Sequence, residues 1–138
     1  FLQIAALIRL EYLAPLVFPI ASFWGRFSQI LAVGNFKYIN NNGNSSFHKR
    51  YWEGTLKEIF PSTILIILII FCLIYFPIPT VSQLNIILGT LISLIPAILI
   101  PILINKKIGG HNGDTYGASV VLVETITLLF LSAFLIPK

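Results

Sequence analysis

Four long apolar runs dominate the chain, and short polar stretches separate them. The runs are Tyr12–Val33, Glu58–Phe76, Gln83–Ile104 and Ala118–Pro137. A helix that crosses a membrane needs about 20 mostly apolar residues, because the hydrocarbon core is about 30 Å thick. The runs show no alternation of apolar and polar positions, so their length favours helix over strand. The pattern predicts about four transmembrane helices, and Phe1–Ile8 is predicted to be the end of a fifth.

Composition supports this prediction. Only 10% of the residues are charged and 57% are hydrophobic, with a mean hydropathy of +0.90. A soluble domain has about 25% charged residues, so there is too little charge here to cover a soluble surface. The single cysteine, Cys72, excludes a disulfide framework within the chain. We expect an all-α, polytopic membrane protein, with residues 1–138 forming part of one integral membrane domain.

Prolines inside two of the runs predict kinked helices. Pro15 and Pro19 lie near the start of the first run, and Pro96 and Pro101 lie inside the third. Proline ends most helices in water, because it lacks an N–H and its ring clashes with the preceding turn. In a membrane, neighbouring helices and local rewinding satisfy the freed carbonyl groups. We therefore expect kinks, not breaks, in the first and third helices.

The basic residues between the runs predict the topology. Segments 34–57 and 105–117 contain six of the cations: Lys37, Lys49, Arg50, Lys57, Lys106 and Lys107. The two helices between these segments return the chain to the same side of the membrane. Cytoplasmic loops are enriched in Lys and Arg, so this side is predicted to be cytoplasmic. The aromatic and basic residues of 47–54 fit either the headgroup level or an anionic ligand.

The segment "GGHNGDTYG", Gly109–Gly117, is the most polar short stretch between two apolar runs. Glycine allows positive φ angles and lets backbone N–H groups approach a ligand closely. The segment precedes a helix that we expect to begin near Ala118, and a helix N-terminus favours phosphate. Lys106 and Lys107 add positive charge just before it. These features predict a phosphate site that uses the backbone of Gly109, Gly110 and Gly113.

Asp114 is the only carboxylate in this segment. A lone carboxylate beside phosphate needs a cation, and Mg²⁺ is commonly held by one or two carboxylates together with substrate oxygens. His111 and Asn112 offer hydrogen-bonding groups to a substrate. The alternative is a tight interhelical turn in which Asp114 caps the next helix. The pattern is neither a P-loop nor a dinucleotide fingerprint, because it lacks Gly-Lys-Ser/Thr and no strand precedes it.

Two charged residues, Arg26 and Glu124, lie inside the apolar runs. A charge at the centre of a membrane costs about 2.5–3.5 kcal/mol on insertion scales, so each needs a partner or a wet cavity. One interpretation is an ion pair that holds two helices together. The other is a polar pocket beneath the glycine segment, in which Arg26 faces a phosphate. The two interpretations are compatible.

The stretch "GGHNGDTYGASVVLVETITLL" resembles the C-terminal signature of the cobalamin synthase family, the adenosylcobinamide-GDP ribazoletransferases. The family pattern is G-G-x-T-G-D-x-x-G-A, followed by a Glu in an apolar helix. The matching residues are Gly109, Gly110, Gly113, Asp114, Gly117, Ala118 and Glu124. Asn112 stands where the family usually has Thr. Pro19, Gly25 and Arg26 are similar to an upstream apolar-Pro…Gly-Arg segment, so the resemblance spans nearly the whole chain.

The resemblance implies an integral transferase of the cell (inner) membrane that acts late in vitamin B12 biosynthesis. Its substrates would be adenosylcobinamide-GDP and α-ribazole or α-ribazole 5′-phosphate, with release of GMP and a requirement for Mg²⁺. Positioning and charge neutralisation do most of the catalysis in phosphoryl transfer. Asp114 would be the catalytic metal ligand, and the glycine segment, Lys106, Lys107, Arg26 and Glu124 would bind substrate. Nucleic acid is not an expected partner.

The family also has an Asp-rich motif in its N-terminal part, and this chain has no Asp besides Asp114. The chain also opens within an apolar run. We therefore expect that the N-terminal half of the protein is missing and that this part is inactive alone. The alternative function is a transport or scaffold subunit, with the glycine segment as a hinge and Arg26 and Glu124 as a gate or strut. The Asp-Gly…Ala-Arg…Asp spacing of CDP-alcohol phosphotransferases is absent.

Overall fold

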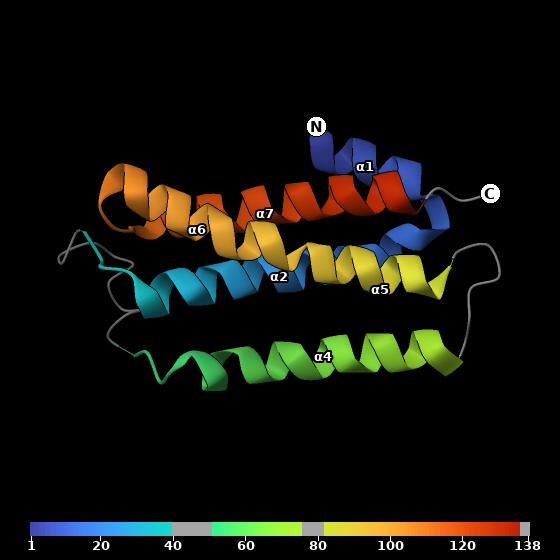
Figure 1. Ribbon diagram of the computed structural model, residues 1–138, viewed down its shortest axis with the longest axis horizontal. Coiled ribbons are helices and arrows are strands. Elements are labelled where there is room, and N and C mark those ends of the chain that lie inside the picture. Colours follow the sequence, from blue (N-terminus) through green and yellow to red (C-terminus); the bar gives the residue numbers. More distant parts are fainter. Residues whose placement is uncertain (40–50, 76–81, 136–138) are drawn as a thin grey trace.

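The computed structural model describes residues 1–39, 51–75 and 82–135, and nearly all of them are helical. Figure 1 shows the helices lying roughly side by side. In chain order they are α1 (Leu2–Leu10), the short 3-10 helix η1 (Glu11–Leu13), α2 (Ala14–Asn35), α4 (Thr55–Tyr75), α5 (Gln83–Ile92), α6 (Leu94–Ile108) and α7 (Gly113–Phe134).

Four stretches are long and apolar enough to cross a membrane: Leu2–Asn35, Thr55–Cys72, Gln83–Ile108 and Gly113–Phe134. The prediction of an all-α, polytopic membrane protein is therefore confirmed. The expected end of a fifth helix is α1, which stops at Leu10. The chain then turns at Glu11, which has a positive φ of 50°. This turn separates α1 from the first of the four predicted runs.

α2 lies between the other helices and packs against α7, α6 and α4 (Figure 1). Small residues on α2 allow the close contact with α7. A Cβ atom on Gly25 would lie 2.8 Å from Glu124 Cγ and 3.1 Å from Val120 Cγ1. Ala21 and Ser28 are also fully buried on α2. α1 packs along α7, where the Gln3 amide donates to the Thr125 hydroxyl at 3.0 Å.

The prolines affect the two helices differently. α2 continues through Pro19 without interruption. The third span is interrupted at Ser93, between α5 and α6. Pro96 has no N–H to donate to the carbonyl group of Ile92, which weakens the helix at this point. The Ser93 hydroxyl donates to the Gly89 carbonyl at 2.8 Å, so a side-chain hydrogen bond is formed at the interruption. The expected kink in the third helix is thus a one-residue interruption.

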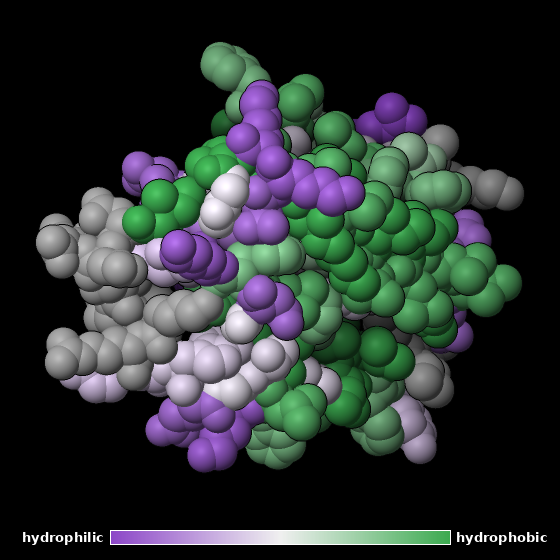
Figure 2. All heavy atoms as spheres, turned by 60° about the vertical axis from the view of Figure 1, so that its left-hand side comes forward, coloured by the Kyte–Doolittle hydropathy of each residue, from purple (hydrophilic) through white to green (hydrophobic). Residues whose placement is uncertain are grey.

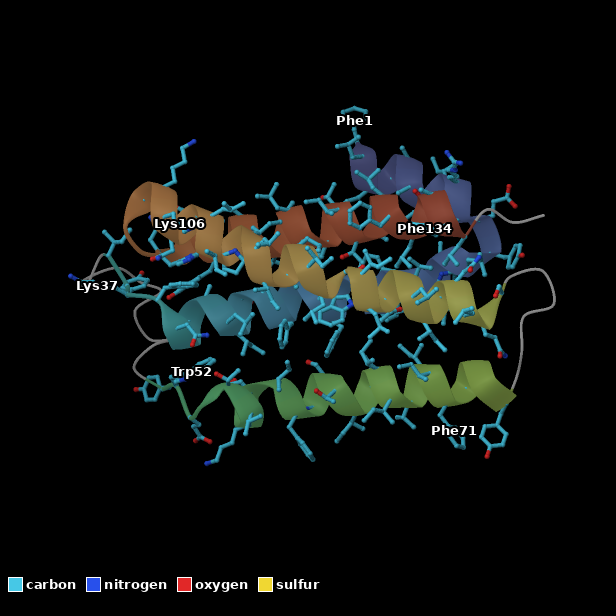
Figure 3. All side chains as sticks on the ribbon, in the orientation of Figure 1. Phe1, Lys37, Trp52, Phe71, Lys106 and Phe134 are labelled. Atoms are coloured by element: carbon cyan, nitrogen blue, oxygen red, sulfur yellow. The ribbon has the colours of Figure 1, made fainter. Side chains whose placement is uncertain are left out.

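The two basic segments lie at the same end of the bundle, as the sequence predicted. Figure 3 shows Lys37, Trp52 and Lys106 together at one end, whereas Phe71 and Phe134 lie toward the other. We call the end with Lys37, Trp52 and Lys106 the basic end. Figure 2 shows polar side chains gathered on this side of the molecule, next to a broad hydrophobic surface. Lys49 and Arg50 lie outside the described residues.

α4 is the helix with the least buried surface. Only 6% of the residues in its apolar stretch Thr55–Cys72 are buried. Ile66 is its buried contact with the main core, Ile69 and Ile70 also pack there, and large side chains such as Phe60 and Phe71 are exposed. An apolar surface of this kind is normal for a helix that faces lipid, because the bilayer interior is itself apolar. α4 therefore lies at the border of the bundle.

Candidate functional site

The turn between α6 and α7 contains most of the predicted site residues. Lys106 and Lys107 lie exposed in the last turn of α6. Gly109 then adopts a left-handed conformation, with φ 81° and ψ 18°, and its N–H donates to the Asn105 carbonyl at 2.8 Å. Glycine is preferred here because a side chain would be strained at this φ angle. Gly109 thus ends α6, and its N–H, one of those predicted to bind phosphate, is used in the helix cap instead.

Gly110 lets this turn pair with the segment that follows α2. The His111 N–H donates to the Lys37 carbonyl at 2.8 Å, and the Ile39 N–H donates to the His111 carbonyl at 2.9 Å. Gly110 has a φ angle of 155°, and a Cβ atom there would lie 2.6 Å from the Lys37 carbonyl oxygen. The absence of a side chain is therefore required for the pairing, which fixes the turn to the basic end.

α7 begins at Gly113, earlier than the start near Ala118 that the sequence suggested. Asn112 is the N-cap, and its side-chain oxygen accepts from the Thr115 N–H at 2.9 Å. The Thr115 hydroxyl accepts in return from the Asn112 N–H at 2.7 Å. This reciprocal capping box satisfies two donors at the helix start. The interpretation of Asp114 as the cap is therefore wrong, because Asn112 occupies that position.

Asp114 lies exposed in the first turn of α7. Its carboxylate makes no hydrogen bond or salt bridge to any described residue, so it is free to meet a ligand. The N–H groups of Gly113 and Asp114 belong to the unsatisfied donors that every helix start presents. Together with the positive end of the helix dipole and the two lysines, they favour an anion at this position.

His111 is fully buried, and its ring is part of the packing. The imidazole stacks on Phe36 and Tyr116, with ring centroids 5.3 Å and 5.6 Å away. Its Nε2 lies 3.0 Å from the Pro101 carbonyl oxygen, and its Nδ1 lies 3.3 Å from the Thr115 hydroxyl. A carbonyl oxygen only accepts, so Nε2 carries the hydrogen. Burial lowers the pKa of His111 below 6.5, which favours the neutral ring.

Arg26 and Glu124 approach each other between α2 and α7. Glu124 lies over Gly25, with Ser22 and Arg26 of α2 nearby. Arg26 donates to the Gln29 side-chain oxygen at 3.0 Å. Among the described residues, the salt bridge recorded within 4.0 Å is the one between Lys57 and Glu53. The two charges therefore interact through space, without the direct ion pair that one interpretation required.

A cleft lies between α2 and α4. One part, of about 380 Å³, is lined by Arg26, Gln29, Ile30, Val33, Tyr51, Trp52, Glu58 and Ser62. A second part, of about 200 Å³, shares Arg26 and Ser62 and extends to Ser22. We call the two parts together the α2–α4 cleft. Its lining includes no residue of the α6–α7 turn, so the structure does not place Arg26 beneath the glycine segment.

The sequence analysis did not identify Ser22, Gln29, Glu58 and Ser62 as site residues. The spacing of these residues in the sequence could have indicated them. Ser22, Arg26 and Gln29 recur at helical spacing on α2, and Glu58 and Ser62 lie four residues apart on α4. Residues three or four apart share a helix face, so each set predicts a polar stripe on an apolar helix. That the two stripes face one another depends on helix packing, which the sequence pattern does not reveal.

The described residues contain no group of three or more His, Cys, Asp or Glu side chains placed to hold a metal ion. Asp114 contributes one carboxylate, and Glu124 lies ~15 Å further along α7 at about 1.5 Å per residue. One carboxylate is compatible with Mg²⁺ only when phosphate oxygens, water or other protein groups complete its coordination. The residues present thus fit part of a magnesium site.

Comparison with known proteins finds several relatives that share one name. An adenosylcobinamide-GDP ribazoletransferase of Prochlorococcus marinus strain SARG is 48% identical over 135 residues, which are 97% of this chain and 52% of that protein. The protein of the same name from P. marinus strain MIT 9303 is 44% identical over 140 residues, with the same coverage. One from Trichormus variabilis is 31% identical over 119 residues, or 85% of this chain and 45% of that protein. No solved structure matches.

The chain spans about half the length of the curated relatives that it matches. The model of the cobalamin-5-phosphate synthase family matches residues 1–132, which include Arg26, Glu124 and the whole α6–α7 turn. The chain therefore belongs to the cobalamin-5-phosphate synthase family.

Proposed function

We propose that this chain is part of a membrane-embedded transferase that joins adenosylcobinamide-GDP to α-ribazole or its 5′-phosphate and releases GMP. Family membership over nearly the whole chain supports the proposal, and so do the names of the relatives. In this reaction a ribazole hydroxyl attacks the phosphorus attached to cobinamide, the bond from that phosphorus to the GMP oxygen breaks, and the hydroxyl loses its proton.

The single observation that supports this activity best is the free start of α7. The diphosphate of adenosylcobinamide-GDP would lie against the N–H groups of Gly113 and Asp114, where the helix dipole favours negative charge. Lys106 and Lys107 lie exposed in the last turn of α6 and would add attraction for the phosphates. The pairing of His111 with Lys37 holds this backbone in place before substrate binds.

Asp114 would hold a Mg²⁺ ion at the proposed diphosphate site. Its exposed carboxylate, which has no partner among the described residues, suits this role. The remaining ligands would come from the substrate, water and the part of the enzyme that this chain does not include. When bound, the ion would neutralise charge that develops on the phosphates during transfer.

The basic end would face the cytoplasm of the cell (inner) membrane. Lys37 and Lys106 lie there (Figure 3), and Lys107 follows Lys106 directly in the chain. The positive-inside rule assigns such an end to the cytoplasm. This orientation would open the α6–α7 turn to water-soluble nucleotide substrates.

Asp114→Asn in the intact enzyme tests the metal and catalytic role. We expect Mg²⁺-dependent release of GMP to fall about 100-fold or more, the magnitude typical for loss of one electrostatic contribution at a reaction centre. Membrane insertion should not change, because Asp114 does not cap α7 and makes no hydrogen bond or salt bridge to any described residue. Glu11→Gln, at the other end of the bundle, is the matched control and should keep wild-type turnover. Wild-type turnover in Asp114→Asn would refute the role of Asp114.

A further inference from the structure

The α2–α4 cleft combines an apolar end with a polar end. Ile30, Val33 and Trp52 line the part nearer the basic end of α2, whereas Arg26 and Ser62 are shared by both parts of the cleft. Its larger part, about 380 Å³, falls in the range of about 300–1,000 Å³ that is typical for small-molecule sites. A ligand that suits this cleft has one apolar end and one polar or anionic end.

Trp52 supplies a fixed aromatic surface at the apolar end. A Cβ atom on Gly34 would lie 2.9 Å from the Trp52 ring, so the indole packs directly on this glycine. Trp52 also packs against the small cluster that includes Val33 and Tyr38. The ring is thus held from the side of α2 and still lines the cleft. Fixed aromatic rings of this kind stack well with planar bases.

Arg26 has donors available for a ligand at the polar end. One of its amino groups donates to Gln29, and it forms no salt bridge with any described residue. A guanidinium group carries five N–H donors and binds phosphate through two of them at once. Glu58, also on the lining, is not in a salt bridge of the described residues either, and its carboxylate is able to accept from a sugar hydroxyl.

We propose that the α2–α4 cleft binds the acceptor substrate, a ribonucleoside 5′-phosphate whose base is apolar. This inference rests on the proposed function, since that reaction uses one small nucleoside and one much larger corrinoid. The base would stack on Trp52 among aliphatic side chains that do not recognise the hydrogen-bonding edge of a purine. The 5′-phosphate would bind Arg26, and the ribose would lie near Glu58 and Ser62. A corrin macrocycle is too large for the cleft.

Gly25 brings α7 close to two of the residues that line the cleft. Because Gly25 has no side chain, Glu124 of α7 lies close over α2, near Ser22 and Arg26, and both of these α2 residues line the cleft. Polar groups therefore continue from the cleft across the face of α2 toward the helix that begins with the proposed diphosphate site. An acceptor bound in the cleft would lie beside this polar connection rather than in an isolated pocket.

Equilibrium binding to the purified intact enzyme tests the assignment. The ligands are α-ribazole 5′-phosphate and α-ribazole, measured without the corrinoid donor and with a chelator present, so that binding at Asp114 does not contribute. We expect Trp52→Ala to weaken both ligands about tenfold or more, as loss of one stacking surface does. Trp52→Phe should restore most of the affinity. Arg26→Gln should weaken the phosphate form more than α-ribazole itself.

Two neighbouring substitutions serve as controls. Phe60→Ala removes an exposed aromatic ring of α4 that does not line the cleft. Glu53→Gln removes a carboxylate next to Trp52 that pairs with Lys57. Both should leave the affinity for α-ribazole 5′-phosphate unchanged. In the full reaction, the Trp52 and Arg26 variants should raise the KM for the acceptor and leave the KM for adenosylcobinamide-GDP as in the wild type.

The outcomes separate the two proposals. Wild-type acceptor affinity in a folded Trp52→Ala enzyme that still releases GMP would overturn the cleft assignment and leave the transferase function standing. Acceptor binding that depends on Trp52, in an intact enzyme without transferase activity, would overturn the proposed function alone. Loss of binding on addition of phosphatidylglycerol, with no effect of Trp52→Ala, would identify Arg26 as a lipid headgroup site and refute the cleft assignment.

Discussion

The imidazole of His111 holds three parts of the chain together at the basic end. It stacks on Phe36 after α2, accepts at Nδ1 from the Thr115 hydroxyl of α7, and donates from Nε2 to the Pro101 carbonyl of α6. In the neutral ring both nitrogens have a hydrogen-bond partner, as buried polar groups in folded proteins generally do. The sequence predicted a substrate-binding role for His111. That role stays a prediction, and the burial points to positioning of the α6–α7 turn.

Protonation of His111 should destabilise the folded protein. Burial lowers its pKa in the folded state below 6.5, so between the two pKa values the unfolded chain binds more protons. The stability that the neutral ring contributes is therefore intact above about pH 6.5 and is lost as the pH falls below it. Thermal unfolding in detergent, measured from about pH 8 to about pH 5, checks this. His111→Asn should show a smaller loss of Tm on acidification than the wild type; an equal loss would contradict the prediction.

At the scale of elements, the contact between α2 and α7 determines how close Glu124 lies to α2. Gly25 allows Glu124 and Val120 to lie against the backbone of α2. In the sequence, Gly25 stands beside Arg26 in an apolar run, and both residues match the Gly-Arg segment of the family. The start of α7 was less predictable. The capping box of Asn112 and Thr115 begins the helix at Gly113. The glycines on both sides of it are also typical of a turn, so the sequence pattern placed the start too late.

Gly25→Val should separate α2 from α7. Added side-chain atoms would overlap Glu124 and Val120, and overpacking of this kind costs about 1–3 kcal/mol. We expect a lower Tm in detergent and a loss of GMP release, since Glu124 would move away from Arg26. Gly117→Ala is the matched control on α7, because a Cβ atom there has open space. It should keep or raise the Tm, as alanine favours helix over glycine. Equal stability of both variants would argue against close packing at Gly25.

At the scale of the whole molecule, the two basic segments between the spans meet at one end, where Figure 3 shows Lys37 and Lys106. The two segments lie at the same end because the two spans between them return the chain to it. The described residues also provide one exposed carboxylate at the α6–α7 turn and no cluster of three metal ligands. The lack of such a cluster among them is consistent with the half-length coverage of the relatives.

Labelling in intact cells checks the orientation. Lys107→Cys and Glu11→Cys are made separately in an enzyme that carries Cys72→Ala. A membrane-impermeant maleimide added outside the inner membrane should label Glu11→Cys and leave Lys107→Cys unlabelled until the membrane is opened. The reverse pattern would place the α6–α7 turn on the outer side and contradict the proposed cytoplasmic site.

The 138-residue chain alone should not release GMP from adenosylcobinamide-GDP and α-ribazole 5′-phosphate. Asp114 provides a single carboxylate at its turn, and the chain matches only about half of its relatives' length. Co-expression with the remaining half of the enzyme should restore turnover, with Mg²⁺ dependence. Turnover by the purified chain alone would show that its own residues complete the site.

The sequence by itself determined the helices, the shared side of the basic segments and the family, because each of these depends on local composition, spacing or motif. It also predicted a site at Asp114 and the glycines around it, and that role stays a prediction. Only the tertiary structure decided that Arg26 faces α4 and that Trp52 joins it in one cleft. It also decided that His111 is buried. These depend on side chains far apart in sequence, and their contacts arise from the angle and depth at which apolar helices pack.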